Sequence, residues 1–168
     1  GLISKKNKYR DSYRSIVQNK LNLISHRGPD GSKICESNDC ILGHSILSIQ
    51  GTNKFQNQPF TDGRYFLLFN GEILNINDVK YELDEYKDIF EIDDSDTSAL
   101  FYGLIKFGSD FLKNIDGFYT CMFYDEYEKT GFIARDPGGQ KQLYYSTLQD
   151  SLQISSEIKG LKIPNSIK

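Results

Sequence analysis

The stretch Arg64-Tyr65-Phe66-Leu67-Leu68-Phe69-Asn70-Gly71-Glu72-Ile73 decides how the rest of the sequence is interpreted. Its apolar, aromatic first part predicts a buried strand that runs to Phe69. Asn70-Gly71 predicts the end of that strand, because glycine and asparagine tolerate backbone angles that other residues avoid. A strand that ends there exposes a side-chain amide and a backbone N–H, the donors that an oxyanion requires. The same dipeptide is also a strong hairpin-turn signal, so both interpretations stay open at this point.

Composition predicts a folded protein with a sheet-rich core. The 168 residues are 38% hydrophobic and 13% aromatic, with eleven Tyr and eleven Phe. A net charge of -3 argues against general binding to nucleic acid. No run reaches the apolar length of a membrane span, and the lysine-rich start lacks the apolar segment of a signal peptide. We therefore expect a soluble protein without nucleic-acid or membrane partners.

Cysteine and histidine are too sparse to predict a metal centre. The cysteines Cys35, Cys40 and Cys121 show no Cys-x-x-Cys spacing, and the two histidines are His26 and His44. An odd cysteine count without a framework is typical of the reducing cytoplasm. We expect no metal site in this chain.

Periodicity predicts helices and strands in an order that defines the fold class. Apolar residues recur at helical spacing over Tyr9–Ile24, Asn77–Tyr86 and Thr97–Phe107, with Asp96 as a candidate N-cap of the third helix. Strands are expected before and after these middle helices, at 1–3, 33–37, 40–49, 64–69, 118–124, 131–135, 142–146 and 151–155. Strands, then helices, then strands indicate an α+β fold with antiparallel sheets.

Several short blocks, taken together, resemble a known family. They are His26-Arg27-Gly28-Pro29-Asp30-Gly31, Leu42-Gly43-His44, Leu47-Ser48-Ile49, Gln58-Pro59-Phe60, Phe69-Asn70-Gly71-Glu72-Ile73, Ser95-Asp96-Thr97, Gly117-Phe118, Ala134-Arg135-Asp136, Leu143-Tyr144-Tyr145 and Ser156-Glu157-Ile158-Lys159. In this order they resemble the amino-terminal glutaminase domain of the asparagine synthetases, which are class II glutamine amidotransferases.

The resemblance implies a fold and a domain organisation. It implies an N-terminal-nucleophile fold, a four-layer αββα sandwich with two antiparallel sheets. The glutamine amidotransferase-like domain is expected to cover residues 1–158. Residues 159–168 are expected to form a linker or tail toward a synthetase domain.

The resemblance also implies roles for individual residues. In the family, an amino-terminal cysteine attacks the carboxamide of glutamine, and its own α-amine acts as the base. By motif match, Asn70 and the N–H of Gly71 form the oxyanion hole. Asp96 binds the α-amino group of the substrate, and Glu72 is a second candidate for substrate contact. An arginine that pairs with the substrate carboxylate falls at the position of Ile46.

Two positions depart from the family pattern. The family begins Cys-Gly-Ile or Cys-Gly-Leu, so the nucleophile is expected immediately before Gly1. Ile46 offers no partner to a carboxylate. One explanation is that a cysteine precedes Gly1 in the mature protein. The other, which Ile46 favours, is a degenerate glutaminase domain, similar to that of the β-lactam synthetases, kept as a structural or interaction domain.

Partners and cofactors follow from the same resemblance. Glutamine or a related small molecule is the expected ligand, and a synthetase domain in cis or in trans is the expected partner, with a homodimer as an open alternative. ATP and magnesium are expected only in the synthetase domain, because no phosphate-binding loop appears in these residues. His26 and Arg27 are expected to hold the turn at 28–30, and His44 to be a core residue.

Overall fold

The computed structural model describes residues 2–4, 10–47, 58–148 and 151–161. The chain divides into two compact units, residues 1–51 with 142–168, and residues 52–141. Each unit has an antiparallel sheet of its own, of five strands in the first and four in the second.

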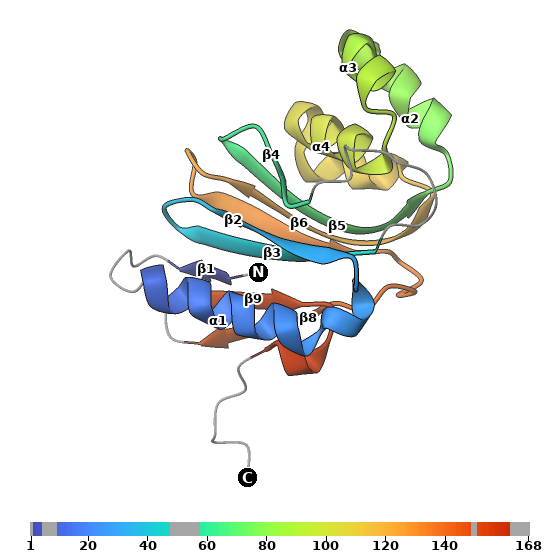
Figure 1. The fold of residues 1–168 in the computed structure, drawn as a ribbon. Coiled ribbons are helices and arrows are strands. Elements are labelled where there is room, and N and C mark those ends of the chain that lie inside the picture. Colours follow the sequence, from blue (N-terminus) through green and yellow to red (C-terminus); the bar gives the residue numbers. More distant parts are fainter. Residues whose placement is uncertain (1, 5–9, 48–57, 149–150, 162–168) are drawn as a thin grey trace. The chain divides into compact units, whose positions relative to one another are not determined.

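The first unit combines the two ends of the chain. Its sheet has the order β2-β3-β1-β9-β8, formed by Gly31–Glu36, Cys40–Ile46, Leu2–Ser4, Ser151–Ser155 and Tyr144–Leu148 (Figure 1). Helix α1, Arg10–Leu23, packs Val17 and Leu21 against Ile41 of the sheet. Short 3-10 turns η2, Ser25–Arg27, and η5, Ile158–Gly160, complete the unit.

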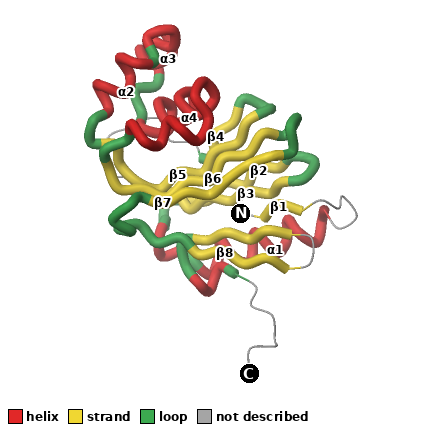
Figure 2. The backbone as a smooth tube through the Cα atoms, turned by 180° about the vertical axis from the view of Figure 1, so that it is seen from behind, coloured by secondary structure: helices red, strands yellow, loops and turns green. Residues whose placement is uncertain are grey.

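The second unit places helices on one face of its sheet. The strand order is β4-β5-β6-β7, formed by Phe60–Thr61, Tyr65–Ile73, Gly117–Asp125 and Thr130–Arg135. Helix α4, Asp96–Phe107, lies along this sheet, and α2, Ile76–Glu82, and α3, Lys87–Ile92, lie beyond it (Figure 2). Two 3-10 segments follow α2 and α4, η3 at Asp84–Tyr86 and η4 at Gly108–Asn114.

An aromatic core joins α4 to the sheet. Phe101 of α4 is fully buried, and its ring lies 4.8 Å from that of Phe60 and 6.3 Å from that of Phe123. A Cβ atom at Gly103 would lie 1.9 Å from the ring of the buried Phe111. A glycine at this helical position therefore lets η4 pack closely against α4.

The class predicted from the sequence is confirmed. The two sheets are antiparallel throughout, and the helices predicted at 9–24 and 97–107 appear as α1 and α4. The helix predicted over 77–86 is divided into α2 and η3, and α3 and the short strand β4 were not predicted. Residues 48 and 49 of the strand predicted over 40–49 lie outside the described residues. The expected linker at 159–168 stays a prediction.

The prediction that Asn70-Gly71 ends its strand is wrong, and so is the hairpin alternative. Strand β5 continues to Ile73, and it pairs with β6 over its whole length, up to Ile73 opposite Gly117. A Cβ atom at position 71 would lie 2.3 Å from the carbonyl oxygen of Phe118. Glycine is needed here for close approach to the neighbouring strand, and not for a turn.

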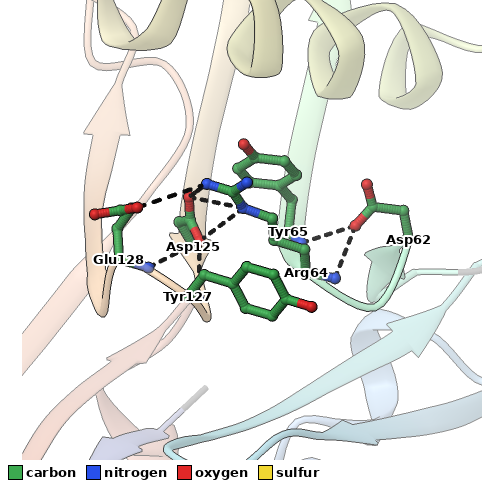
Figure 3. A network of polar contacts seen from close by, with 6 residues as sticks. All are labelled: Asp62, Arg64, Tyr65, Asp125, Tyr127 and Glu128. Atoms are coloured by element: carbon green, nitrogen blue, oxygen red, sulfur yellow. Dashed lines mark hydrogen bonds and ion pairs between the residues drawn. The ribbon is translucent and has the colours of Figure 1, made fainter.

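A network of polar contacts links the start of β5 to the end of β6 (Figure 3). The Arg64 guanidinium donates to both carboxylate oxygens of Asp125 at 2.7 to 3.2 Å. It also lies 4.7 Å from the ring centre of Tyr65 and 5.1 Å from that of Tyr127. The hydrogen bonds from Arg64 lower the pKa of Asp125 to about 2, and the N–H groups of Glu128 and Tyr127 act in the same direction. The ionised carboxylate therefore stabilises the turns at this end.

We expect the Arg64→Met substitution to lower the melting temperature by about 3 to 6 °C at pH 7. Because the pKa of Asp125 is lower in the folded state, its contribution is complete above about pH 4 and is lost as the pH falls toward 2. Thermal unfolding from pH 7 to pH 2 should therefore show a weaker pH dependence in the variant. Lys113→Met, which removes an exposed pair with Asp110, is the control and should change little. Identical pH profiles for Arg64→Met and the parent would contradict the assignment.

Candidate functional site

The outer edge of β5 carries the groups that the sequence singled out. The N–H of Leu74, just after β5, donates to the carbonyl oxygen of Asp116, just before β6. The even-numbered residues of β5 therefore direct their N–H and C=O groups toward β6. Backbone direction alternates along a strand, and the odd-numbered residues therefore point to the other edge. Two of them have side-chain acceptors there. The N–H of Phe69 donates to Oε1 of Gln58 at 2.6 Å, and that of Ile73 donates to Oδ2 of Asp96 at 2.9 Å.

The N–H of Gly71 lies between these two on the same edge. Its register partner Tyr119 turns both backbone groups away from β5, toward Asp136. The Tyr119 carbonyl oxygen accepts the N–H of Asp136 at 2.8 Å, and the Tyr119 N–H donates to the Asp136 carboxylate at 3.3 Å. Within residues 58–141, the described part of the second unit, the Gly71 N–H has no acceptor. Strand β4 does not reach it, since its pairing begins at Phe60 opposite Leu67. Among the described residues, the Gly71 N–H is therefore without an acceptor, whereas the outward N–H groups of Phe69 and Ile73 on either side of it are both bonded.

Asn70 and Glu72 flank this donor along the strand. Leu67, Phe69 and Ile73 face the core under α4, so by alternation Asn70 and Glu72 lie on the other face of the sheet. Asn70 is half-buried and Glu72 is exposed. The carboxamide of Asn70 has no recorded partner in the described part of the chain. A backbone N–H beside a carboxamide is a donor pair that can stabilise an oxyanion.

Asp96 lies at the start of α4 with its carboxylate directed to β5. Ser95 is the N-cap and accepts the N–H of Ser98 at 3.1 Å, so the N-cap role predicted for Asp96 is wrong. Burial raises the pKa of Asp96, the N–H of Ile73 opposes that shift, and the charge of Glu72 adds to it. The net pKa lies above the ordinary value. A half-buried carboxylate with a like-charged neighbour favours a cationic ligand.

Gln58 is a member of the site that the sequence did not assign. It is 7% exposed, and besides Phe69 it contacts Thr97, donating from Nε2 to Oγ1 at 3.3 Å. The only signal in the sequence was its place in the block Gln58-Pro59-Phe60. Because its partners lie 11 and 39 residues away, local spacing does not reveal this role.

Ile46, the position of the family arginine, is the last residue of β3 in the first unit. Its carbonyl oxygen accepts the N–H of Asp30 at 3.1 Å. A Cβ atom at Gly28 would lie 2.5 Å from the Ile46 nitrogen, so the turn at 28–30 packs directly on this strand end. The Ile46 side chain is half-buried and supplies no charge.

The block at 26–29 and the block at 156–159 meet in the first unit. Glu157 accepts from Nε2 of His26 at 2.8 Å and forms ion pairs with Arg27 at 3.6 Å and Lys159 at 3.2 Å. Burial raises the pKa of Glu157, but hydrogen bonds from Lys159 and His26 outweigh it, so the pKa lies below its usual value. The contact joins segments 131 residues apart and indicates a structural role for both blocks.

His44 and the three cysteines are poorly suited to catalysis. Burial lowers the pKa of His44 to about 4, which leaves it neutral near pH 7. Burial raises the pKa of Cys121 to about 12 and also raises that of Cys35, and Cys40 is buried. A thiol with a raised pKa is a weak nucleophile at neutral pH.

Among the described residues, no group of three or more His, Cys, Asp or Glu side chains is arranged to hold a metal ion. Among the described helices, none is both long enough and apolar enough to cross a bilayer.

Comparison with known proteins identifies the family. The model of the glutamine amidotransferase domain matches residues 1–168. Relatives include an asparagine synthetase of Triphysaria versicolor, 35% identical over 82% of this chain, and the amidase chry2 of Gibberella zeae, 34% identical over 86%. Asparagine synthetase 3 of Bacillus subtilis is 28% identical over 94%. The chain spans only 22% to 27% of the length of these relatives.

A solved structure shows the fold. The glutamine phosphoribosylpyrophosphate amidotransferase of B. subtilis, complexed with ADP and GMP, matches 87% of this chain and 40% of its own, with a TM-score of 0.64 at 20% identity. This likeness confirms the N-terminal-nucleophile fold expected from the sequence. The family match over residues 1–168 shows that the chain belongs to the glutamine amidotransferase domain family.

Proposed function

We propose that this domain hydrolyses glutamine to glutamate and ammonia. The open N–H of Gly71, next to the carboxamide of Asn70, is the observation that supports this function most directly. A thiol supplied immediately before Gly1 adds to the carboxamide carbon, and the carbonyl oxygen becomes the oxyanion that these two groups stabilise. The α-amine of the cysteine that carries this thiol takes the thiol proton and passes it to the carboxamide nitrogen, so the C–N bond breaks and ammonia leaves. Water then hydrolyses the thioester, which releases glutamate and restores the thiol.

Two carboxylates give this site a preference for an amino acid. Asp96 is anchored by the N–H of Ile73 through one oxygen, Oδ2, and Glu72 is close enough to raise its pKa. An α-ammonium group bound here would relieve the cost of keeping Asp96 charged while it is half-buried. We therefore assign Asp96, with Glu72 as a second contact, to the amino group of glutamine.

A second candidate function is a structural or interaction domain without glutaminase activity. Ile46 favours it, since no charged side chain stands where the family has its carboxylate-binding arginine. A buried carboxylate without a partner is strongly disfavoured. This candidate predicts neither glutamine hydrolysis nor a rise in melting temperature on adding glutamine.

We also propose a synthetase partner and a location. The chain covers about a quarter of its asparagine synthetase relatives, so a synthetase domain in cis or in trans is the natural consumer of the ammonia. ATP and magnesium belong to that partner, which would activate the acceptor carboxylate. A thiol nucleophile requires reducing surroundings, which places the reaction in the cytoplasm.

The direct test uses full-length protein with a cysteine as its first residue, immediately before Gly1, called the reference protein below. Incubation with glutamine should release glutamate and ammonia in equal amounts. Replacing that cysteine by serine should abolish the release. Absence of hydrolysis by the reference protein, with no thermal shift on adding glutamine, would favour the interaction domain.

Asn70→Asp should lower kcat of the reference protein by about 100- to 1000-fold, because it removes one oxyanion donor. The KM for glutamine and the melting temperature should change little, since the substitution preserves shape and Asn70 has no recorded partner in the described residues. Steady-state glutaminase kinetics and thermal unfolding measure both. A loss of stability that accounts for the lost activity would contradict the oxyanion role.

Asp96→Asn should abolish glutamine binding and raise the melting temperature at pH 7, on the order of 2 °C. The amide oxygen can still accept the Ile73 N–H, whereas the desolvated charge is removed. Because the pKa of Asp96 is higher in the folded state, its ionisation lowers stability above about pH 4, and the gain should disappear toward pH 3.

Asp94→Asn is the matched control for this substitution. It neutralises an exposed carboxylate two residues away that pairs with Lys80, and it should neither stabilise the protein nor affect glutamine binding. Thermal shift with and without glutamine compares the two variants. If Asp96→Asn and Asp94→Asn change the melting temperature and the response to glutamine equally, Asp96 acts only through its charge and does not contact the substrate.

Ile46→Arg should lower the KM for glutamine about tenfold or more, because a guanidinium forms charge-assisted hydrogen bonds with the α-carboxylate. Its kcat should change less, since the gain is in substrate binding. Ile46→Met, which adds a long side chain without charge, is the control and should leave KM unchanged. If the two variants behave alike, position 46 does not contact the substrate carboxylate.

A further inference from the structure

Gln58 occupies an unusual place at the edge of β5. Its side chain is almost completely buried, and its carboxamide makes two hydrogen bonds that point in different directions. Oε1 accepts the N–H of Phe69 at 2.6 Å, and Nε2 donates to Oγ1 of Thr97 at 3.3 Å. Because the Thr97 bond fixes the amide orientation, the oxygen is held toward the strand.

The register of β4 explains what this contact replaces. Phe60 pairs with Leu67 and Thr61 with Phe66, so the same register would set residue 58 opposite Phe69. The strand begins only at Phe60, however, and at residue 58 the side chain takes the place of a backbone carbonyl. A strand that continued beside β5 would approach the next outward N–H, that of Gly71, and would compete for it.

A side-chain acceptor thus satisfies Phe69 without covering Gly71. On the other side, Asp96 does the same for Ile73 at 2.9 Å. Both acceptors connect β5 to the first turn of α4, through Thr97 in one case and Asp96 itself in the other. In the described part of the chain, the Gly71 N–H is therefore left without an acceptor, while the N–H groups two residues before and after it are held by Gln58 and Asp96.

We propose that Gln58 is a positioning residue that holds the edge of β5 so that the N–H of Gly71 stays open and aimed at the oxyanion. This inference rests on the proposed glutaminase function. Gln58 acts through Phe69 and contacts no reacting atom, so it is not a catalytic residue. Its effect should appear in the chemical step, where the oxyanion forms, and not in glutamine binding.

The test compares three variants of the reference protein. Gln58→Met removes both hydrogen bonds at similar length, and we expect kcat to fall about 10- to 100-fold with KM within about threefold. Gln58→Glu keeps an oxygen for the Phe69 N–H and should recover kcat to within about fivefold of the reference. Arg64→Met destabilises the opposite end of the same strand and should leave kcat unchanged.

The kinetic outcomes separate positioning from general stability. A fall in kcat for Gln58→Met with rescue by Gln58→Glu supports the proposal. An unchanged kcat in Gln58→Met overturns it, and so does an equal fall in Arg64→Met. A rise in KM alone would assign Gln58 to substrate binding and would also overturn it.

A second measurement does not depend on activity. Hydrogen–deuterium exchange of the segment around Phe69 in the full-length protein should be about tenfold faster or more in Gln58→Met, and unchanged in Arg64→Met and Gln58→Glu. If the reference protein hydrolyses no glutamine, the proposed function fails, and this measurement still decides whether Gln58 holds the edge. Unchanged exchange in Gln58→Met would refute the positioning role.

Discussion

The pairing of β5 with β6 is the constraint on which the second unit depends. It extends over nine residues, and it commits every second backbone group of β5 to β6. The remaining N–H groups must face the other edge, where β4 covers only the first part. The side chains of Gln58 and Asp96 satisfy two of the uncovered groups, and no acceptor among the described residues covers the N–H of Gly71. The candidate oxyanion donor is thus a consequence of sheet geometry.

This arrangement requires a rigid support because it lowers stability locally. Burial raises the pKa of Asp96, and the outward N–H of Gly71 has no acceptor among the described residues. The support comes from the aromatic core beneath, where Phe101 packs against Phe60 and Phe123. This packing fixes β5 without using its open edge.

Sequence patterns predicted the elements whose periodicity is local. Helices α1 and α4 and the β6–β7 hairpin follow from spacing within 20 residues. The strand end predicted at Asn70-Gly71 was wrong because pairing of these two residues with Thr120 and Tyr119 overrides their turn preference. The N-cap was predicted at Asp96 and lies at Ser95, because serine and aspartate are equally good caps and the sequence does not distinguish between adjacent positions. Gln58 was missed because its two partners are distant in sequence, and only the folded strand brings them together.

The two parts of the candidate site differ in how they depend on sequence. The Gly71 N–H is a backbone group, and it persists as long as residue 71 is small enough to approach Phe118. A carboxylate-binding group is a single side chain, and one substitution removes it. An intact β5 edge therefore follows from the fold even where the reaction has been lost. Ile46 is the more sensitive indicator, and glutamine affinity at that position distinguishes an active glutaminase from a domain kept for its structure.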